Sequence, residues 1–104
     1  MNLLEKLRSK SARIGIIGLG YVGIPLAVRF SEIGFGVLGF DIDQERVSTL
    51  NAGKSPIEHI ASSDITQMVA NKFEATTDFS RIGEADAIII CVPTPLSKHR
   101  EPDL

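Results

Sequence analysis

The sequence predicts an α/β fold in which a doubly wound parallel sheet of about four strands carries helices on both faces. Apolar, strand-like runs alternate with helical segments along the chain, an order typical of parallel sheets. The first run breaks into a glycine-rich turn that opens directly into a helical pattern. The second run ends on an acid, and the last is the most apolar stretch of the chain. The four runs lie at residues 12–17, 35–41, 73–77 and 85–92.

Composition limits the chain to one globular domain and excludes several classes of function. The 104 residues are 43% hydrophobic and 23% charged, values that are ordinary for a globular protein. The net charge of −2 argues against a nucleic-acid surface or a basic membrane patch. No apolar run approaches the about 20 residues that span a bilayer, and charges interrupt the N-terminus too early for a signal peptide. The single cysteine, Cys91, fits the reducing cytoplasm.

Residues 1–11 are predicted to form a lead-in to the domain proper, residues 12–104. Leu3, Leu4 and Leu7 recur at helical spacing, so residues 2–10 favour a short amphipathic helix. A partly frayed extension docked on the edge of the domain fits the same residues, and the sequence leaves both open.

The glycine turn, residues 18–23, is the first candidate site. It follows a strand and begins a helix, whose N-terminus presents unpaired backbone N–H groups to an anion such as a pyrophosphate. The first glycine permits the sharp turn, the second lets the backbone approach the phosphates, and the third lets helix and strand pack closely. A glycine turn without a ligand is the alternative. The candidate binding residues are Gly18, Leu19, Gly20, Tyr21, Val22 and Gly23.

The helix that follows the turn is predicted at residues 21–33. Pro25 falls within its first turn, where a backbone N–H has no partner inside the helix to lose. Gly34 is expected to end the helix. The apolar residues Val22, Leu26, Phe30 and Ile33 recur at helical spacing, and the small residue Ala27 is expected to face the sheet.

The second strand ends on Asp41, which stands 18 residues after Gly23. This is close to the spacing at which a carboxylate meets the adenosine ribose in a βαβ unit. A carboxylate accepts hydrogen bonds from both ribose hydroxyls and repels a 2′-phosphate, so the pattern favours NAD over NADP. The alternative role of Asp41 is to cap the next helix, although Asp43 is also placed to do so.

Residues 44–51 form the next predicted helix, with Val47 and Leu50 turned inward and Gly53 as its stop. Arg46 lies on the first turns of this helix, where its guanidinium could stack on or flank an adenine. A solvated arginine on the helix surface fits the spacing equally well.

The second half of the chain continues the alternation of helices and strands. A helix capped by Ser63 or Asp64 is predicted to run to about residue 71. A strand at residues 73–77 and a short helix at residues 78–83 follow, and residues 85–92 predict a buried parallel strand.

Neither a metal site nor a catalytic set of residues is expected in this chain. His59 has no second histidine or cysteine nearby at the spacing of metal ligands. Cys91 lies inside the last apolar run, where a small core residue is expected rather than a nucleophile.

The segment after the last strand is a second candidate site. Two prolines brace Thr94 in an extended conformation at the carboxyl end of a strand, the edge of an open α/β sheet at which ligands bind. The candidate binding residue here is Thr94, whose hydroxyl and backbone could meet a ligand over the glycine turn.

Several segments are more specific than spacing alone: GLGYVGIPLA (18–27), GFDID (39–43), NAGKSPIEHI (51–60), CVPTPL (91–96) and REPDL (100–104). Together they resemble the UDP-glucose/GDP-mannose dehydrogenase family over nearly all of the chain after residue 11. Within that family, residues 57–60 and 73–81 are similar to the UDP-N-acetyl-D-glucosamine 6-dehydrogenases of O-antigen and capsule synthesis.

The resemblance implies a Rossmann-type domain that binds NAD, in an oxidoreductase for polysaccharide biosynthesis. Such enzymes oxidise the C6 alcohol of a UDP-sugar to a carboxylate by two hydride transfers to NAD, while a cysteine holds the intermediates. The resemblance assigns the pyrophosphate to residues 18–23, the ribose to Asp41, and cofactor contacts to Arg46 and residues 92–94.

The family's catalytic cysteine and substrate-binding residues match no position in this chain, and Cys91 does not correspond to that cysteine. We therefore expect the NAD-binding part of a cytoplasmic enzyme that is homo-oligomeric at full length, with the Rossmann sheet truncated after about four strands. Alone, the chain is expected to be inactive.

A stand-alone dinucleotide-sensing regulatory module is the alternative, since such modules also open with a strand, a glycine turn and an acid. The proline-braced segment around Thr94 favours the enzyme. The identity of the sugar and the roles of Lys98, His99 and Arg100 do not follow from the sequence.

Overall fold

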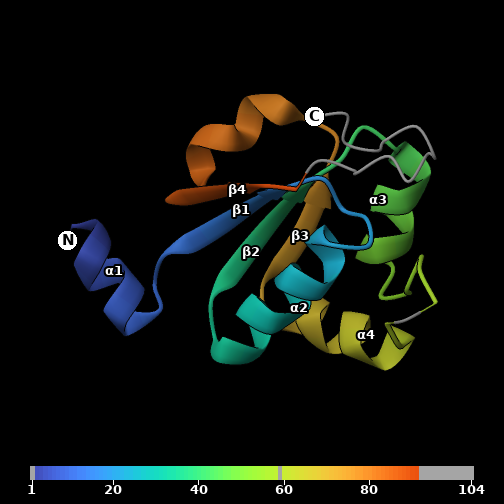
Figure 1. Cartoon of the computed structure of the whole chain (residues 1–104), viewed down its shortest axis with the longest axis horizontal. Coiled ribbons are helices and arrows are strands. Elements are labelled where there is room, and N and C mark those ends of the chain that lie inside the picture. Colours follow the sequence, from blue (N-terminus) through green and yellow to red (C-terminus); the bar gives the residue numbers. More distant parts are fainter. Residues whose placement is uncertain (1, 59, 92–104) are drawn as a thin grey trace, which may run out of the picture.

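A four-stranded parallel sheet forms the centre of the computed structural model, which describes residues 2–58 and 60–91 (Figure 1). All neighbouring strands pair in parallel, in the order β3-β2-β1-β4. The chain therefore starts in the middle of the sheet, builds outward to one edge and then crosses to the other, which confirms the predicted α/β class. The strands are β1 (Arg13–Ile17), β2 (Gly36–Phe40), β3 (Phe73–Thr76) and β4 (Ala87–Ile90).

Helices lie on both faces of the sheet (Figure 1). Three of them pack on one face, where their apolar side chains join a single core with alternate residues of β1, β2 and β3. The short 3₁₀ helix η1 crosses the other face between β3 and β4, and its Phe79 ring contacts Phe40 of β2 with centroids 5.5 Å apart. The helices are α1 (Leu3–Ser9), α2 (Gly23–Ile33), α3 (Gln44–Asn51), α4 (Ser62–Ala70) and η1 (Phe79–Glu84).

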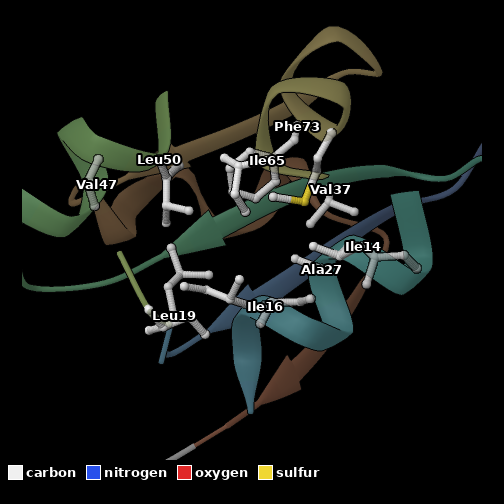
Figure 2. Close-up of a cluster of buried hydrophobic side chains, with 14 residues drawn as sticks. Ile14, Ile16, Leu19, Ala27, Val37, Val47, Leu50, Ile65 and Phe73 are labelled. Carbon is white, nitrogen blue, oxygen red and sulfur yellow. The ribbon is translucent and has the colours of Figure 1, made fainter. Parts of the chain in front are cut away.

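The core lies between the first face of the sheet and helices α2, α3 and α4. Figure 2 shows Leu19, from the glycine turn, pointing into this cluster beside Ile16. Because the turn contributes a fully buried side chain, its position is fixed by the core as well as by its own backbone. The buried members are Ile14, Ile16, Leu19, Ile24, Ala27, Val28, Val37, Val47, Leu50, Ile57, Ile65, Met68, Phe73 and Ala75.

The first helix, α1, forms as the leucine spacing predicted. Asn2 and Glu5 close a capping box at its start, each side chain accepting a hydrogen bond from the other's backbone N–H. The helix contributes no buried residue, and it extends beyond the amino end of the sheet (Figure 1). The salt bridge from Lys6 to Asp86, at 2.8 Å, ties it to the segment before β4.

On α2, Ala27 faces the core as predicted, but the four apolar residues at helical spacing do not form the buried face. Val22 and Ile33 are exposed, while Leu26 and Phe30 are only partly buried against the core. Spacing alone could not select the face, because apolar residues occur around most of this helix. The small side chains decide which face is buried, since they allow the helix to approach the sheet closely. The residues that do face the core side are Gly23, Ile24, Ala27, Val28 and Ser31.

The boundaries of the helices agree closely with the predictions. Pro25 lies within the first turn of α2, and Gly34 ends that helix with φ 119°. Helix α3 spans the predicted residues, with Val47 and Leu50 buried as expected. The predicted cap of α4 was wrong, because Ala61 occupies that position and no side chain caps the helix.

The prediction of a buried last strand was also wrong for one face of β4. Ala87 and Ile89 pack against the core, but Ile88 is 38% exposed and Ile90 is 65% exposed. β4 is an edge strand of the described sheet, and η1 covers the second face only in part. A uniformly apolar strand is typical of burial on both faces. One face of β4 is therefore exposed although its residues are apolar.

Charged side chains hold η1 against the amino end of the sheet. Arg81 of η1 reaches Glu74 of β3 at 2.7 Å and Glu84 at 2.9 Å, and Arg13 of β1 reaches Glu84 at 3.0 Å. These hydrogen bonds from Arg81 hold the pKa values of the Glu74 and Glu84 carboxyls below their usual range. The second face therefore combines an apolar contact at one end with an ion-pair network at the other.

Candidate functional site

A cleft of about 650 Å³ opens at the carboxyl ends of β1 and β2. It contains the whole glycine turn, the acid after β2 and the single arginine of α3. In an open parallel sheet this edge is where ligands bind. Here it lies beside β1, which has β2 on one side and β4 on the other, so the strand order reverses at this point. The lining residues are Ile17, Gly18, Leu19, Gly20, Tyr21, Val22, Gly23, Phe40, Asp41, Ile42, Asp43, Arg46, Phe79 and Cys91.

The outer glycines of the turn are required by close backbone contacts. Gly18 has φ 100°, and a Cβ added there would overlap the carbonyl oxygen of Cys91. A Cβ added at Gly23 would overlap the carbonyl oxygen of Gly18. The backbone of the turn is also fixed to β2, since the Gly18 N–H donates to the Phe40 carbonyl at 2.8 Å. These two glycines therefore serve the shape of the turn itself.

Gly20 has a different environment. A Cβ added there would meet only one atom within 4 Å, the Nη1 of Arg46 at 3.7 Å, so the space above it is open to the cleft. Among the described residues, no acceptor meets the backbone N–H groups of Gly20, Val22 or Gly23. Helix α2 also has no side-chain cap at its start. The turn therefore presents unpaired donors and the positive end of a helix to an anion.

Asp41 joins β2 to the glycine turn. Its Oδ2 accepts from the Leu19 N–H at 2.8 Å, and its Oδ1 accepts from the Asp43 N–H at 2.9 Å. It does not cap α3, because Asp43 does so by accepting from the N–H groups of Glu45 and Arg46. Each carboxylate oxygen can accept a second hydrogen bond, so Asp41 retains capacity for a ligand at the cleft.

Arg46 points from α3 toward the same turn. Its Nη1 donates to the Leu19 carbonyl at 3.1 Å, and the side chain is half-buried. The alternative of a solvated arginine on the helix surface is therefore wrong. The guanidinium has further N–H donors that this bond does not use.

Two exposed apolar residues line the cleft although the sequence did not indicate them. Ile42 follows Asp41 directly and is 87% exposed, and Phe79 begins η1 with 37% of its surface exposed. Phe79 reaches the cleft because β3 pairs with β2 and ends at the same edge, where the Asp41 N–H donates to the Thr76 carbonyl. Only an assumed strand order, with β3 next to β2, could have predicted that Phe79 lies at the cleft.

Other candidate residues contribute less, or lie elsewhere. Cys91 is half-buried, burial raises the pKa of its thiol, and its N–H donates to the Ile17 carbonyl at 2.7 Å. Within residues 2–58 and 60–91 there is no cluster of three or more metal-binding side chains. The same residues include no helix long and apolar enough to cross a membrane. Outside the described residues lie His59, Val92, Pro93, Thr94, Lys98, His99 and Arg100.

Comparison with known proteins connects this geometry to one family. Residues 12–104 match the model of the UDP-glucose/GDP-mannose dehydrogenase family, NAD binding domain. A solved structure with the same fold is the ternary complex of GDP-mannose dehydrogenase from Pseudomonas aeruginosa. It matches with a TM-score of 0.75 and 38% identity, covering 83% of this chain and 20% of that one.

Curated relatives carry related names. The UDP-N-acetyl-D-mannosamine dehydrogenase of Escherichia coli is 40% identical over 97 residues, covering 89% of this chain and 22% of the relative. The UDP-N-acetyl-D-glucosamine 6-dehydrogenase of Pseudomonas aeruginosa is 34% identical over 95 residues, covering 91% and 22%. The chain thus spans about a fifth of the length of these relatives.

Proposed function

The chain belongs to the UDP-glucose/GDP-mannose dehydrogenase family, whose NAD-binding domain it carries, and from this premise we propose that its cleft holds NAD for a nucleotide-sugar 6-dehydrogenase. Residues 12–104 form the binding domain in this proposal, and residues 1–11 form a lead-in outside it. The observation that carries the proposal is the set of unpaired N–H groups beside the open space above Gly20, next to the carboxylate of Asp41.

The residues of the cleft fit the chemistry of NAD part by part. A pyrophosphate needs hydrogen-bond donors without a side chain in the way, and the turn at Gly20 offers both. The free acceptor capacity of Asp41 suits the two ribose hydroxyls. The apolar surfaces of Ile42 and Phe79 suit an adenine ring.

Arg46 and the segment with Val92, Pro93 and Thr94 complete the proposed cofactor site. Arg46 lines the cleft with unused N–H donors, and the segment is assigned to the cofactor by its resemblance to the family. When bound, NAD supplies the hydride acceptor for oxidation of an alcohol, while the chain's own residues bind and orient it.

The substrate and the oxidation are proposed for the longer enzyme of which this domain is the NAD-binding part. The two curated relatives reported above are named for UDP-N-acetylhexosamines, so we propose that the C6 alcohol of a UDP-N-acetylhexosamine is oxidised to a uronic acid. A cytoplasmic homo-oligomer that supplies surface polysaccharide synthesis is part of the same proposal. The regulatory-module alternative has no counterpart among those relatives.

Titration calorimetry with NAD and NADP tests the cofactor assignment on the full 104-residue chain. We expect NAD to bind at least about tenfold more tightly, because the Asp41 carboxylate accepts from ribose hydroxyls and repels a 2′-phosphate. Asp41→Asn removes the charge and is expected to reduce this preference to about threefold or less. Asp64→Asn is the matched control, because Asp64 is exposed in the first turn of α4, outside the cleft, and the preference should stay unchanged.

Two results would contradict this function. The first is equal affinity of the folded wild-type chain for NAD and NADP. The second is the absence of binding by either cofactor in a sample whose circular dichroism and cooperative melting show that it is folded.

A further inference from the structure

The peptide that joins Leu19 to Gly20 is held from one side by Arg46. The Nη1 of Arg46 donates to the Leu19 carbonyl at 3.1 Å, and the described chain contains no cis peptide bond. In a trans peptide the C=O and the following N–H point in opposite directions. A guanidinium that holds the Leu19 carbonyl therefore directs the Gly20 N–H away from itself, and that N–H has no acceptor among the described residues.

Everything on the Leu19 side of this peptide is already fixed. The Leu19 N–H donates to Asp41 at 2.8 Å, and the Leu19 side chain is fully buried. A Cβ added at Gly39 would lie within 3 Å of the Leu19 side chain, so strand β2 makes room for it. On the other side, the Gly20 carbonyl accepts from the Ile24 N–H at 3.0 Å. Glycine tolerates many backbone conformations and has no side chain to restrain the peptide, so the plane between these two residues is what Arg46 holds.

Arg46 is itself well anchored for this task. Its backbone N–H donates to the Asp43 side chain at 3.2 Å, at the capped start of α3. Its guanidinium is planar and offers donors in a fixed geometry, which suits a directional bond to a carbonyl. Within the described ranges, no other side chain donates to the Leu19 carbonyl. Loss of the Arg46 side chain therefore removes the hydrogen bond that restrains this peptide.

We propose that Arg46 is a positioning residue, which fixes the orientation of the Leu19–Gly20 peptide so that the Gly20 N–H faces the pyrophosphate of the cofactor. The inference rests on the proposed function, and it assigns Arg46 an effect through the glycine turn rather than through the adenosine. Its consequence is selective: Arg46 matters for ligands with a pyrophosphate and not for adenosine alone.

Binding of NAD, ADP and adenosine to Arg46→Met and to the wild-type chain tests this selectivity. We expect the variant to bind NAD and ADP about tenfold more weakly, the scale of one lost hydrogen bond to a charged group. Adenosine, which has no pyrophosphate, should change by less than about twofold. Arg29→Met is the matched control, since it removes the same charge from an exposed site on α2 and should leave all three affinities unchanged.

Amide spectra of the labelled, ligand-free chain give a second readout. The Leu19 and Gly20 amide resonances should move in Arg46→Met, and the Gly20 amide should lose its response to ADP. If Arg46→Met does not fold, Arg46→Lys, which keeps the charge without the planar fork, is measured with the same ligands and the same criterion.

Two outcomes overturn the inference while the wild-type chain still binds NAD. If the variant binds ADP and adenosine with equally weakened affinity, Arg46 contacts the adenosine directly. If its affinity for ADP is unchanged, Arg46 has no part in binding. If the folded wild-type chain does not bind NAD, the proposed function itself fails, and the two failures are thereby distinguished.

Discussion

Gly20 differs from the glycines on either side of it in what a side chain would meet. At Gly18 and Gly23 an added Cβ would collide with backbone oxygen atoms of the same small region. At Gly20 it would extend into the cleft, with only the Arg46 guanidinium nearby at 3.7 Å. The three glycines of one motif therefore have two physical purposes, and substitution can separate them.

We expect Gly20→Ala to fold with nearly wild-type stability but to bind NAD at least about tenfold more weakly, because the methyl group occupies the proposed phosphate position. Gly23→Ala should instead lose more than about 3 kcal/mol of unfolding free energy, since a backbone contact must open. Urea denaturation and NAD titration measure the two effects.

Gly83→Ala serves as the control, because nothing lies within 4 Å of a Cβ there and both quantities should stay unchanged. Normal NAD affinity in Gly20→Ala, or wild-type stability in Gly23→Ala, would contradict this division of roles.

At the scale of single elements, the connection between β3 and β4 shows how charge fixes a short helix. η1 has only six residues and no buried one, so packing alone holds it weakly. Arg81 joins it to β3 through Glu74 and stays charged, because the hydrogen bonds that Arg81 donates to Glu74 and Glu84 raise its pKa further. The position of Phe79 at the cleft therefore depends partly on ion pairs at the far end of the same helix.

Stability should decrease as the pH is lowered, and the size of this decrease should depend on Arg81. The folded-state pKa values of Glu74 and Glu84 lie below their usual range, so their contribution is complete above about pH 4.3, the usual glutamate pKa. It is lost as pH falls through the lower folded-state values. Thermal melting from pH 6 to pH 3 should therefore show a smaller decrease in Tm for Arg81→Met than for the wild-type chain.

The expected loss of Tm at pH 7 is only a few degrees, because both carboxylates are nearly half exposed and solvent screens the pairs. Arg29→Met provides the control, as its salt bridge to Glu32 is exposed and lies outside the network. Parallel Tm profiles for Arg81→Met and the wild-type chain would contradict the role given to this network.

Sequence patterns predicted the elements well where local chemistry decides their limits. The end of α2 at Gly34 and the start of α3 at Asp43 follow from glycine and from a capping carboxylate, and both are local properties. The buried face of α2 and the exposure of β4 could not be predicted in the same way. Both depend on which other segments cover a surface, and an apolar sequence does not state that.

The whole molecule brings together residues that the sequence could list only separately. The turn, Asp41 and Arg46 were all candidates, but their mutual contacts at Leu19 depend on the pairing of β1 with β2 and on the start of α3. Phe79 joins them only because the strand order sets β3 next to β2. Spacing along the chain thus identified these residues as candidates, while their contacts with one another required the fold.

The central claim is that NAD lies over the glycine turn and against Asp41. An amide chemical-shift titration of the labelled chain with NAD tests this location most directly. We predict that the largest changes occur at Gly20, Val22, Gly23 and Ile42, with α1 and α4 unaffected. Saturable changes confined to α4, or no changes at the turn while the chain remains folded, would contradict the account.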